Sequence, residues 1–303
     1  MNQLLKYLAG CCRFFLYVLG LCGLGVVLVL SALLFKLLKY TPLKTPLLTI
    51  KQGVPHWWGV YNGWISKTLP LQWHIEGLES LPQNVSYMVI CNHQSWLDTI
   101  ALQYAFSYRL PNPIFFFKRP LYWVPVLGAL LWASNFIPVA RYSKSYLAKH
   151  PERRGEDLER TRLACAQHTK TPVSVVNFVE GTRFSLEKQQ QQGSPFSCLL
   201  KPRAGGTAFA LRALEGDIKT ILNVTVAYPQ GEVSFWDYFC GKVKSIHVYA
   251  ETVSVENVPV GDYENDMNVR QQFQQWLNGL WLEKDALLLR LKAQYQQQKR
   301  IDS

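Results

Sequence analysis

Three apolar runs along the chain end abruptly in polar residues. Met88–Cys91 leads into His93, Thr171–Val179 leads into Glu180, and Thr220–Ala227 leads into a tyrosine and a proline. Short apolar runs with polar ends are typical of buried strands in a parallel sheet. The pattern therefore predicts an α/β fold, a single domain whose mixed, largely parallel sheet is flanked by helices.

A longer apolar run lies near the N-terminus, from Phe14 to Phe35. It is uncharged and about 22 residues long, enough to span the hydrocarbon core of a membrane. It is too long for the core of a signal peptide. We therefore expect residues 1–70 to form an uncleaved membrane anchor, a transmembrane or membrane-dipping helix followed by an interfacial aromatic segment. Residues 71–303 are expected to form the domain itself.

Basic residues favour one orientation of this anchor. Lys6 and Arg13 precede the apolar run, whereas four lysines follow it: Lys36, Lys39, Lys44 and Lys51. The positive-inside rule then places residues 71–303 on the cytoplasmic side of the membrane.

Aromatic residues follow the anchor at helical spacing. Trp57, Tyr61 and Trp64 would lie on one face of a helix, either at the level of the lipid headgroups or packed against the core. Both interpretations remain open at this point.

A second uncharged run extends from Leu121 to Ala140. A span there would place Glu180 and His93 on opposite sides of the membrane, and it contains two prolines and Gly128, which disfavour one continuous helix. We expect a buried or membrane-dipping segment.

Two further features are expected, a helix after the third predicted strand and a loop after the second. An apolar helical stripe predicts an amphipathic C-terminal helix that packs on the domain or, alternatively, contacts the membrane. Its residues are Val269, Phe273, Trp276, Leu277, Leu280, Leu287, Leu288 and Leu291. Gln189–Gln192 are expected to lie in an exposed loop that covers the site.

The composition narrows the possible partners and chemistry. The formal net charge is +11, with basic residues concentrated between positions 141 and 162. Such a surface suits anionic lipid, coenzyme A phosphates or nucleic acid, but no nucleic-acid motif is present and the anchor favours lipid. The seven cysteines show no Cys-x-x-Cys spacing and are expected to be reduced.

The candidate catalytic pair is His93 and Asp98. A histidine whose tautomer is fixed by a nearby carboxylate can act as a general base, and these two residues can meet without long-range assembly. His74 and Glu79 have the same spacing, but they lie in an alternating segment typical of a half-exposed strand that runs into a turn. His93 differs because it follows a fully apolar run. Either Asn92 or Ser95 could cap the helix that follows.

Glu180 and Arg183 repeat this design after the second run. If the strands are parallel, their carboxyl ends meet at one edge of the sheet, where ligands bind in open α/β sheets. The four residues His93, Asp98, Glu180 and Arg183 would then lie together. The alternative is a surface ion pair on a tight turn.

These segments resemble three motif blocks of the glycerolipid acyltransferase superfamily, whose central members are the lysophosphatidic acid acyltransferases. The blocks are His93-x4-Asp98, Phe178–Arg183 and Val224–Pro229. A further block is matched more loosely by 135–141, where an extra residue precedes Arg141. Lys118 resembles a lysine upstream of that block. Beyond these blocks the chain looks most like the bacterial branch of probable acyltransferases.

The resemblance implies a membrane-bound O-acyltransferase. His93 would take the proton from a lysophospholipid hydroxyl as that oxygen attacks an acyl thioester, and Asp98 would orient and balance the imidazole. The 180–183 turn (Glu180, Gly181, Thr182, Arg183), with Lys118 and Arg141, would bind the acceptor. Arg183 suits a phosphate, and Glu180 would accept a hydrogen bond from the glycerol portion.

The remaining expectations concern substrates and alternatives. The donor is acyl-CoA or acyl-ACP, no cofactor and no metal are implied, and the acceptor is 1-acyl-sn-glycerol-3-phosphate or else lysocardiolipin or another lysophospholipid. The expected location is the bacterial inner membrane, with membrane phospholipids as partners and no nucleic acid. Ser95 as a nucleophile, a thioester hydrolase that uses His93 on water, and a non-catalytic protein that binds anionic lipid are the alternatives.

Overall fold

The computed structural model describes residues 3–38, 40–139, 150, 172–213, 218–259, 261, 263 and 265–301. Within them, seven strands form one sheet in the order β1-β7-β6-β2-β5-β3-β4. The strands are β1 (Gln72–Glu76), β2 (Ser86–Cys91), β3 (Pro113–Lys118), β4 (Ile137–Val139), β5 (Ser174–Phe178), β6 (Ile218–Ala227) and β7 (Ser245–Ser254).

The sheet is mixed and largely parallel, as predicted. Strands β6, β2, β5, β3 and β4 run in one direction. The first two strands in the order, β1 and β7, run in the opposite direction, because β7 pairs antiparallel with β6 and β1 pairs parallel with β7. The carboxyl ends of β2, β5 and β6 therefore meet at one edge, which is where the polar segments of the sequence begin.

The central strand β2 explains why its sequence is apolar throughout. Met88, Val89, Ile90 and Cys91 are all fully buried. Successive side chains of a strand point to opposite faces, and Val89 lies in the core on one face whereas Met88 and Ile90 lie in the core on the other. A strand covered on both faces has no polar face to present.

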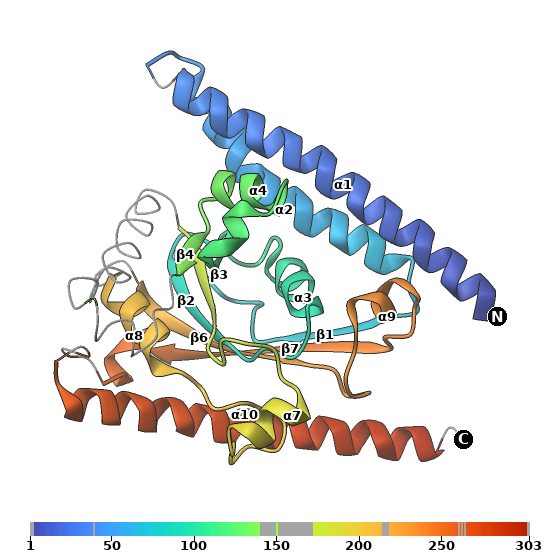
Figure 1. Ribbon diagram of the computed structural model, residues 1–303, viewed down its shortest axis with the longest axis vertical. Helices are drawn as coiled ribbons and strands as arrows, with labels where there is room; N and C mark the ends of the chain where they lie inside the picture. The colour runs from blue at the N-terminus through green and yellow to red at the C-terminus, as the bar shows by residue number, and fades with distance from the viewer. Residues whose placement is uncertain are drawn as a thin grey trace.

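Helices cover both faces of the sheet (Figure 1). On one face, α2, α3 and α9 enclose a core that includes Phe106 and Phe239; on the other, α8 and α10 enclose a core that includes Leu277 and Trp281. The helices are α1 (Gln3–Leu37), α2 (Lys44–Lys67), α3 (Leu97–Phe106), α4 (Leu127–Ala133), α7 (Leu186–Gln191), α8 (Ala204–Ala213), α9 (Phe235–Phe239) and α10 (Met267–Ile301), with short 3-10 turns η1 (Arg119–Trp123) and η3 (Val255–Asn257).

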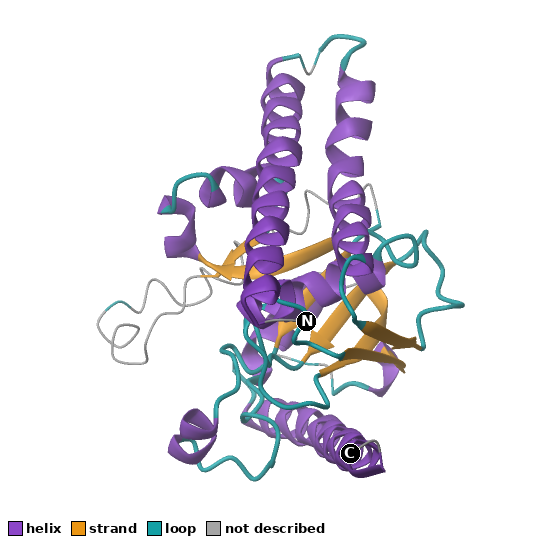
Figure 2. Cartoon of the chain, turned by 90° about the vertical axis from the view of Figure 1, so that its right-hand side faces the viewer, coloured by secondary structure: helices purple, strands orange, loops and turns teal. Residues whose placement is uncertain are grey.

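The N-terminal segment is a helical hairpin. Helix α2 returns along α1, and the turn between them lies far from the sheet (Figure 2). The Tyr61 hydroxyl donates to the carbonyl oxygen of Leu16 at 2.6 Å, which joins the two helices. Among the described residues, α1 is the helix long and apolar enough to cross a membrane. The predicted anchor therefore contains two helices that pack on each other.

The aromatic stripe of α2 divides between the two expected environments. Trp57 and Trp64 are exposed, whereas Tyr61 packs against α1 and the neighbouring Trp58 is buried. The run from Leu121 to Ala140 forms no continuous helix within its described residues, as its prolines and glycine predict. It contains part of η1, then α4 and β4, and α4 packs against α1 through Leu130 and Gly25.

The interpretation of His74 as a strand residue is confirmed. His74 is an exposed residue of β1, and Gly77 ends the strand with a φ of 81°. A Cβ at Gly77 would lie 1.9 Å from the carbonyl oxygen of Ala250, so the turn requires glycine. Glu79 accepts a hydrogen bond from the Gly77 amide at 2.9 Å and so belongs to the turn.

One element differs from its prediction. Gln189–Gln192 were expected to lie in a loop, but Leu186–Gln191 form the helix α7. The Ser185 side chain caps it by accepting a hydrogen bond from the Lys188 amide at 3.3 Å. Glutamine is a good helix former, so a cap immediately before a glutamine-rich stretch is enough to begin a helix. The C-terminal helix was predicted correctly, and it packs on the domain as α10.

Candidate active site

The segment that follows β2 is fixed by its backbone before any chemistry is considered. Asn92 is buried, and its side chain binds the backbone of Val226 on β6. Its Nδ2 donates to the Val226 carbonyl oxygen and its Oδ1 accepts from the Val226 amide, both at 2.9 Å. The His93 amide donates to Glu180 Oε1 at 3.1 Å, and its carbonyl oxygen accepts from the Phe184 amide at 2.7 Å. The backbone of His93 is thus fixed by the turn that follows β5, and the preceding residue, Asn92, is fixed by β6.

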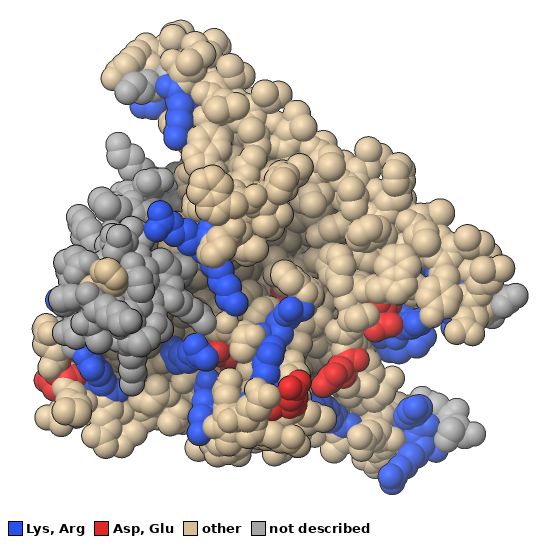
Figure 3. Space-filling model, viewed as in Figure 1, with Lys and Arg blue, Asp and Glu red and all other residues tan. Residues whose placement is uncertain are grey.

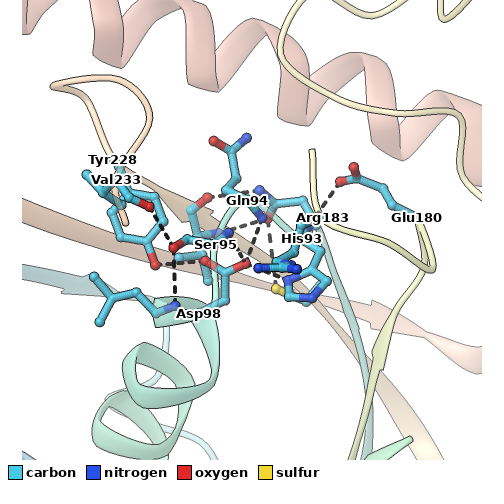
Figure 4. A network of polar contacts seen from close by, with 12 residues as sticks. His93, Gln94, Ser95, Asp98, Glu180, Arg183, Tyr228 and Val233 are labelled. Carbon is cyan, nitrogen blue, oxygen red and sulfur yellow. Dashed lines mark hydrogen bonds and ion pairs between the residues drawn. The ribbon is translucent and has the colours of Figure 1, made fainter. Parts of the chain in front are cut away.

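The His93 ring meets the Asp98 carboxylate directly (Figure 4). His93 Nδ1 lies 2.8 Å from Asp98 Oδ2, and the ring stacks on Phe178 with centroids 4.1 Å apart. The His93 side chain is 17% exposed and that of Asp98 is fully buried. Because a carboxylate can only accept, the neutral imidazole carries its hydrogen on Nδ1. Nε2 is then the nitrogen that can accept a proton from a substrate.

Both oxygens of the Asp98 carboxylate accept hydrogen bonds. Oδ2 also accepts from the amides of Gln94 at 2.6 Å and Ser95 at 3.0 Å, and Oδ1 accepts from the Tyr228 hydroxyl at 2.7 Å. Burial, followed by the Asp98 charge, raises the pKa of Tyr228 well above its usual value, so the phenol remains a donor. These bonds hold the carboxylate in the orientation that faces the imidazole.

Glu180 lies in the same network but not where the sequence suggested. It is fully buried, and its second oxygen accepts from the Leu200 amide at 3.1 Å, so both oxygens are occupied by backbone amides. Burial raises its pKa to about 8, an effect that the two amide bonds oppose. The role predicted for Glu180, a hydrogen bond with the glycerol portion of the acceptor, does not agree with this position. Its carboxylate joins the His93 segment to the chain around Leu200.

The rest of the turn presents Arg183. Gly181 has a φ of 71°, the left-handed conformation that favours glycine, and it turns the chain after Glu180. Lys188 Nζ donates to Thr182 Oγ1 at 3.1 Å and to the Arg183 carbonyl oxygen at 2.9 Å. The Arg183 guanidinium lies over the ring of Trp96, 4.2 Å from its centroid. Stacking uses the face of a guanidinium, whereas its N–H donors point outward in its plane.

Of the two other basic residues predicted to bind the acceptor, the structure describes Lys118 but not Arg141. Lys118 ends β3, next to β5, and is exposed at the same edge of the sheet. Arg141, like the basic residues that follow it to position 162, lies outside the described residues. The substrate contacts predicted for both residues stay predictions.

The alternative of Ser95 as a nucleophile finds no support in the geometry. Ser95 is buried and its hydroxyl donates to the Val233 carbonyl oxygen at 2.8 Å, which is the position of a structural serine. The same hydroxyl accepts weakly from the Leu97 amide, at 3.3 Å. The described part of the chain holds no group of three histidine, cysteine or acidic side chains that could bind a metal ion.

Sequence reasoning missed three participants. Trp96 supports Arg183, Gln94 donates from Nε2 to the Cys198 carbonyl oxygen at 3.0 Å, and the Tyr228 hydroxyl binds Asp98. Tyr228 was noted only as the residue that follows a strand, inside the Val224–Pro229 block, and was given no role. Its position directly after the third apolar run, where the first two runs end in His93 and Glu180, is the signal that could have identified it.

Comparisons with known proteins identify related sequences. The 2-acyl-1-lysophosphatidylinositol acyltransferase of Saccharomyces cerevisiae is 26% identical over 247 residues, covering 67% of this chain and 60% of the relative. An uncharacterized acyltransferase of Schizosaccharomyces pombe is 29% identical over 154 residues, covering 50% of this chain and 47% of the relative. The chain therefore spans less than two thirds of the length of these relatives.

The fold and the family agree as well. The crystal structure of the 1-acyl-sn-glycerophosphate acyltransferase PlsC from Thermotoga maritima superposes with a TM-score of 0.55 at 15% identity, covering 92% of this chain and 98% of that one. A family model described as Acyltransferase matches residues 72–228, more than half of the chain, and spans β1 to Tyr228. The protein belongs to the acyltransferase family, and the predicted family resemblance is confirmed.

Proposed function

We propose that this protein transfers a fatty acyl group from an acyl thioester to the free hydroxyl of a lysophospholipid. The observation that carries the proposal is the pair of His93 Nδ1 and Asp98 Oδ2 at 2.8 Å, with the opposite ring nitrogen available for an acceptor hydroxyl. No nucleophile of the protein is needed, because the acceptor hydroxyl attacks the thioester itself.

The proposed proton path uses His93 twice. Nε2 takes the hydroxyl proton as the acceptor oxygen bonds to the thioester carbonyl carbon. The tetrahedral intermediate then collapses, the carbon–sulfur bond breaks, and the imidazolium returns the proton to the leaving thiolate. Asp98, whose carboxylate is fully buried, stabilises the imidazolium between these steps. The donor is acyl-CoA or acyl-ACP.

The acceptor is proposed from Arg183 and from the names of the relatives. Arg183 lies on the turn beside the catalytic pair and can bind a phosphate through two parallel N–H donors. The structural neighbour is named for 1-acyl-sn-glycerophosphate, our first candidate. The yeast relative is named for a lysophosphatidylinositol, which favours a phosphodiester acceptor as the second. Lysocardiolipin belongs to the second group.

We further propose that the α1–α2 hairpin holds the enzyme at a membrane. In the view of Figure 3, the surface over α1 and α2 is mostly without charged side chains, and basic side chains lie at its turn. Because α2 returns along α1, the hairpin suits insertion from the side that carries the domain. Lys36 and Lys44, which suggested the orientation of the domain, lie at this turn and not beside the domain. The cytoplasmic face of a bacterial inner membrane is therefore proposed on another ground, that acyl thioester donors are made on that side. Labelling of single cysteines at the exposed positions 74 and 187 from opposite faces of vesicles would exclude it.

The experiment is product analysis by mass spectrometry. Purified protein in lipid nanodiscs is supplied with acyl-CoA or acyl-ACP and with 1-acyl-sn-glycerol-3-phosphate, lysophosphatidylinositol or lysocardiolipin, one acceptor at a time. We expect a diacyl product whose formation falls by about 10²–10⁴-fold in His93→Ala. His74→Ala, at an exposed histidine of β1, is the matched control and should keep wild-type activity. Free fatty acid in place of acylated lipid would show a hydrolase.

A further inference from the structure

The C-terminal helix α10 reaches the active site through one buried carboxylate. Asp285 accepts from the Ser197 amide at 2.8 Å through Oδ2 and from the Cys198 amide at 2.6 Å through Oδ1. The residue is 8% exposed. A carboxylate that satisfies two successive backbone amides fixes both the position and the direction of that segment. Asp285 lies well outside the part of the chain that the family model matches.

The segment that Asp285 holds makes two contacts with the catalytic machinery. The Cys198 carbonyl oxygen accepts from Gln94 Nε2 at 3.0 Å, and the Leu200 amide donates to Glu180 Oε2 at 3.1 Å. Gln94 is the residue after the proposed base, and its own amide binds Asp98 at 2.6 Å. Glu180 in turn accepts from the His93 amide. Two chains of hydrogen bonds therefore lead from Asp285 to His93.

Helix α10 is a rigid support for this contact. Lys284, adjacent to Asp285, is 2% exposed, and its Nζ donates to the Val224 carbonyl oxygen and to Thr225 Oγ1 on β6. Trp281 and Leu288, on either side of this pair, are buried in the core beneath the sheet. The helix is thus fixed to the strand that leads to Tyr228, and Asp285 transmits that position to the segment around Cys198.

We infer that Asp285 is a positioning residue for acyl transfer, acting through the Ser197–Leu200 segment on the placement of His93 and Asp98. The inference rests on the proposed function of His93 as the base. A buried amide that loses its acceptor moves to find another, and displacements near 1 Å at a catalytic centre lower rates by as much as about 10²-fold. The acceptor and the donor touch neither Asp285 nor α10 in this scheme, so their binding should change little.

The test separates turnover from binding. Asp285→Asn offers one acceptor to two amides and places an NH₂ group against one of them. We expect kcat to fall by about 10–100-fold while the KM values of acceptor and donor stay within about twofold. Asp285→Ala should be no better. Glu283→Gln, at the exposed acidic residue two positions before Asp285, is the matched control and should leave both parameters unchanged.

A double-mutant cycle distinguishes positioning from a general loss of stability. Gln94→Ala breaks one of the two chains at Cys198 while leaving Asp285 in place, so it should also lower kcat. If both residues act through Cys198, the kcat of the double variant should remain within about threefold of that of the less active single variant. Multiplicative losses would mean that the two residues act independently and would overturn the inference. Gln94→Ala also tests it if Asp285→Asn does not fold, because unchanged turnover there contradicts the first chain.

His93→Ala in the same assay keeps the two proposals apart. If His93→Ala transfers acyl groups at the wild-type rate, the proposed function is wrong. If it is inactive while folded Asp285→Asn has wild-type kcat, the proposed function stands and the positioning role of Asp285 is wrong. A raised acceptor KM with unchanged kcat in Asp285→Asn would likewise contradict positioning, since it would mean a role in binding.

Discussion

The segments that follow β2 and β5 look alike in sequence but differ in what their acids face. Each follows a buried parallel strand and carries a fully buried acidic residue, Asp98 or Glu180. Asp98 shares one oxygen between His93 Nδ1 and two amides, and so faces the proposed base. Glu180 binds two backbone amides, those of His93 and Leu200.

The difference shows that burial and placement at the same sheet edge do not give two acids the same role. A carboxylate that faces an imidazole can stabilise the charge that forms there during proton transfer, whereas one that faces only amides holds the backbone in place. In the second segment the residue that can face a substrate is Arg183, which lies on Trp96. The following experiments test this division, from the largest expected effect to the smallest.

Asp98→Asn should have the largest effect. The substitution removes the charge that balances the imidazolium and allows the other tautomer of His93, so we expect kcat to fall by roughly 10³–10⁴-fold. Steady-state transfer to the preferred lysophospholipid measures it. Asp237→Asn, at a helix-capping acid of α9, should change stability but not turnover. A loss of less than tenfold in Asp98→Asn would mean that Asp98 only shapes the loop.

Arg183→Lys should act on binding. Lysine keeps the charge but loses the planar pair of donors and the stacking on Trp96. We expect the KM of a phosphate-bearing acceptor to rise by about 10–100-fold, corresponding to about 1.5–3 kcal/mol, with slow hydrolysis of the thioester donor nearly unchanged. Arg109→Lys, at an arginine whose Nη1 binds the Ala105 carbonyl, is the control. Weaker donor binding with an unchanged acceptor KM would assign Arg183 to the donor.

Glu180→Gln should lower kcat by about tenfold and leave the acceptor KM unchanged, because the side chain supports His93 and does not touch the substrate. A raised acceptor KM would instead restore the role in glycerol binding that the sequence suggested. The free energy of unfolding provides a second test of Glu180. Its buried carboxyl group binds a proton more tightly than an exposed one, so this free energy should depend on pH.

The pH dependence follows from a pKa raised to about 8, against an ordinary value of 4.5. Between these values the folded protein retains a proton that the unfolded chain has released. The contribution of Glu180 to stability is therefore complete below pH 4.5 and decreases as the pH rises through 8. Denaturant unfolding from pH 5 to 8 should show a decline that is smaller in Glu180→Gln. Equal slopes in the two proteins would contradict the raised pKa.

Sequence alone was sufficient where the relevant contacts are local or follow from strand direction. His93 and Asp98 are five positions apart, and the parallel strands bring Glu180 and Arg183 to the same edge because each follows a buried apolar run. These features follow from the hydrophobic pattern and from the direction of the strands, both of which can be inferred from the sequence.

The remaining features depend on contacts that no periodic pattern encodes. The stripe that predicted α10 counted apolar positions, so it omitted Lys284 and Asp285, which are buried because they bind β6 and the segment around Cys198. Glu180 was assigned to substrate because its amide partners became apparent only when residues 93 and 200 were brought together. Buried polar residues are determined by their partners, and those partners lie far away in the chain.

The smallest expected effect comes from Tyr228→Phe, which leaves the Asp98–His93 pair intact and removes only the hydroxyl that donates to Asp98 Oδ1 at 2.7 Å. Three donors remain on Oδ2, so the carboxylate keeps its place but gains some freedom to rotate. We expect kcat to fall by about 3–10-fold, with both KM values unchanged. Tyr87→Phe removes the hydroxyl of another buried tyrosine, which donates to the Pro82 carbonyl oxygen near the opposite end of β2, and should leave kcat unchanged. Equal losses in the two variants would show that Tyr228 contributes only to packing. A loss in Tyr228→Phe as large as that in Asp98→Asn would mean that the phenol itself takes part in proton transfer.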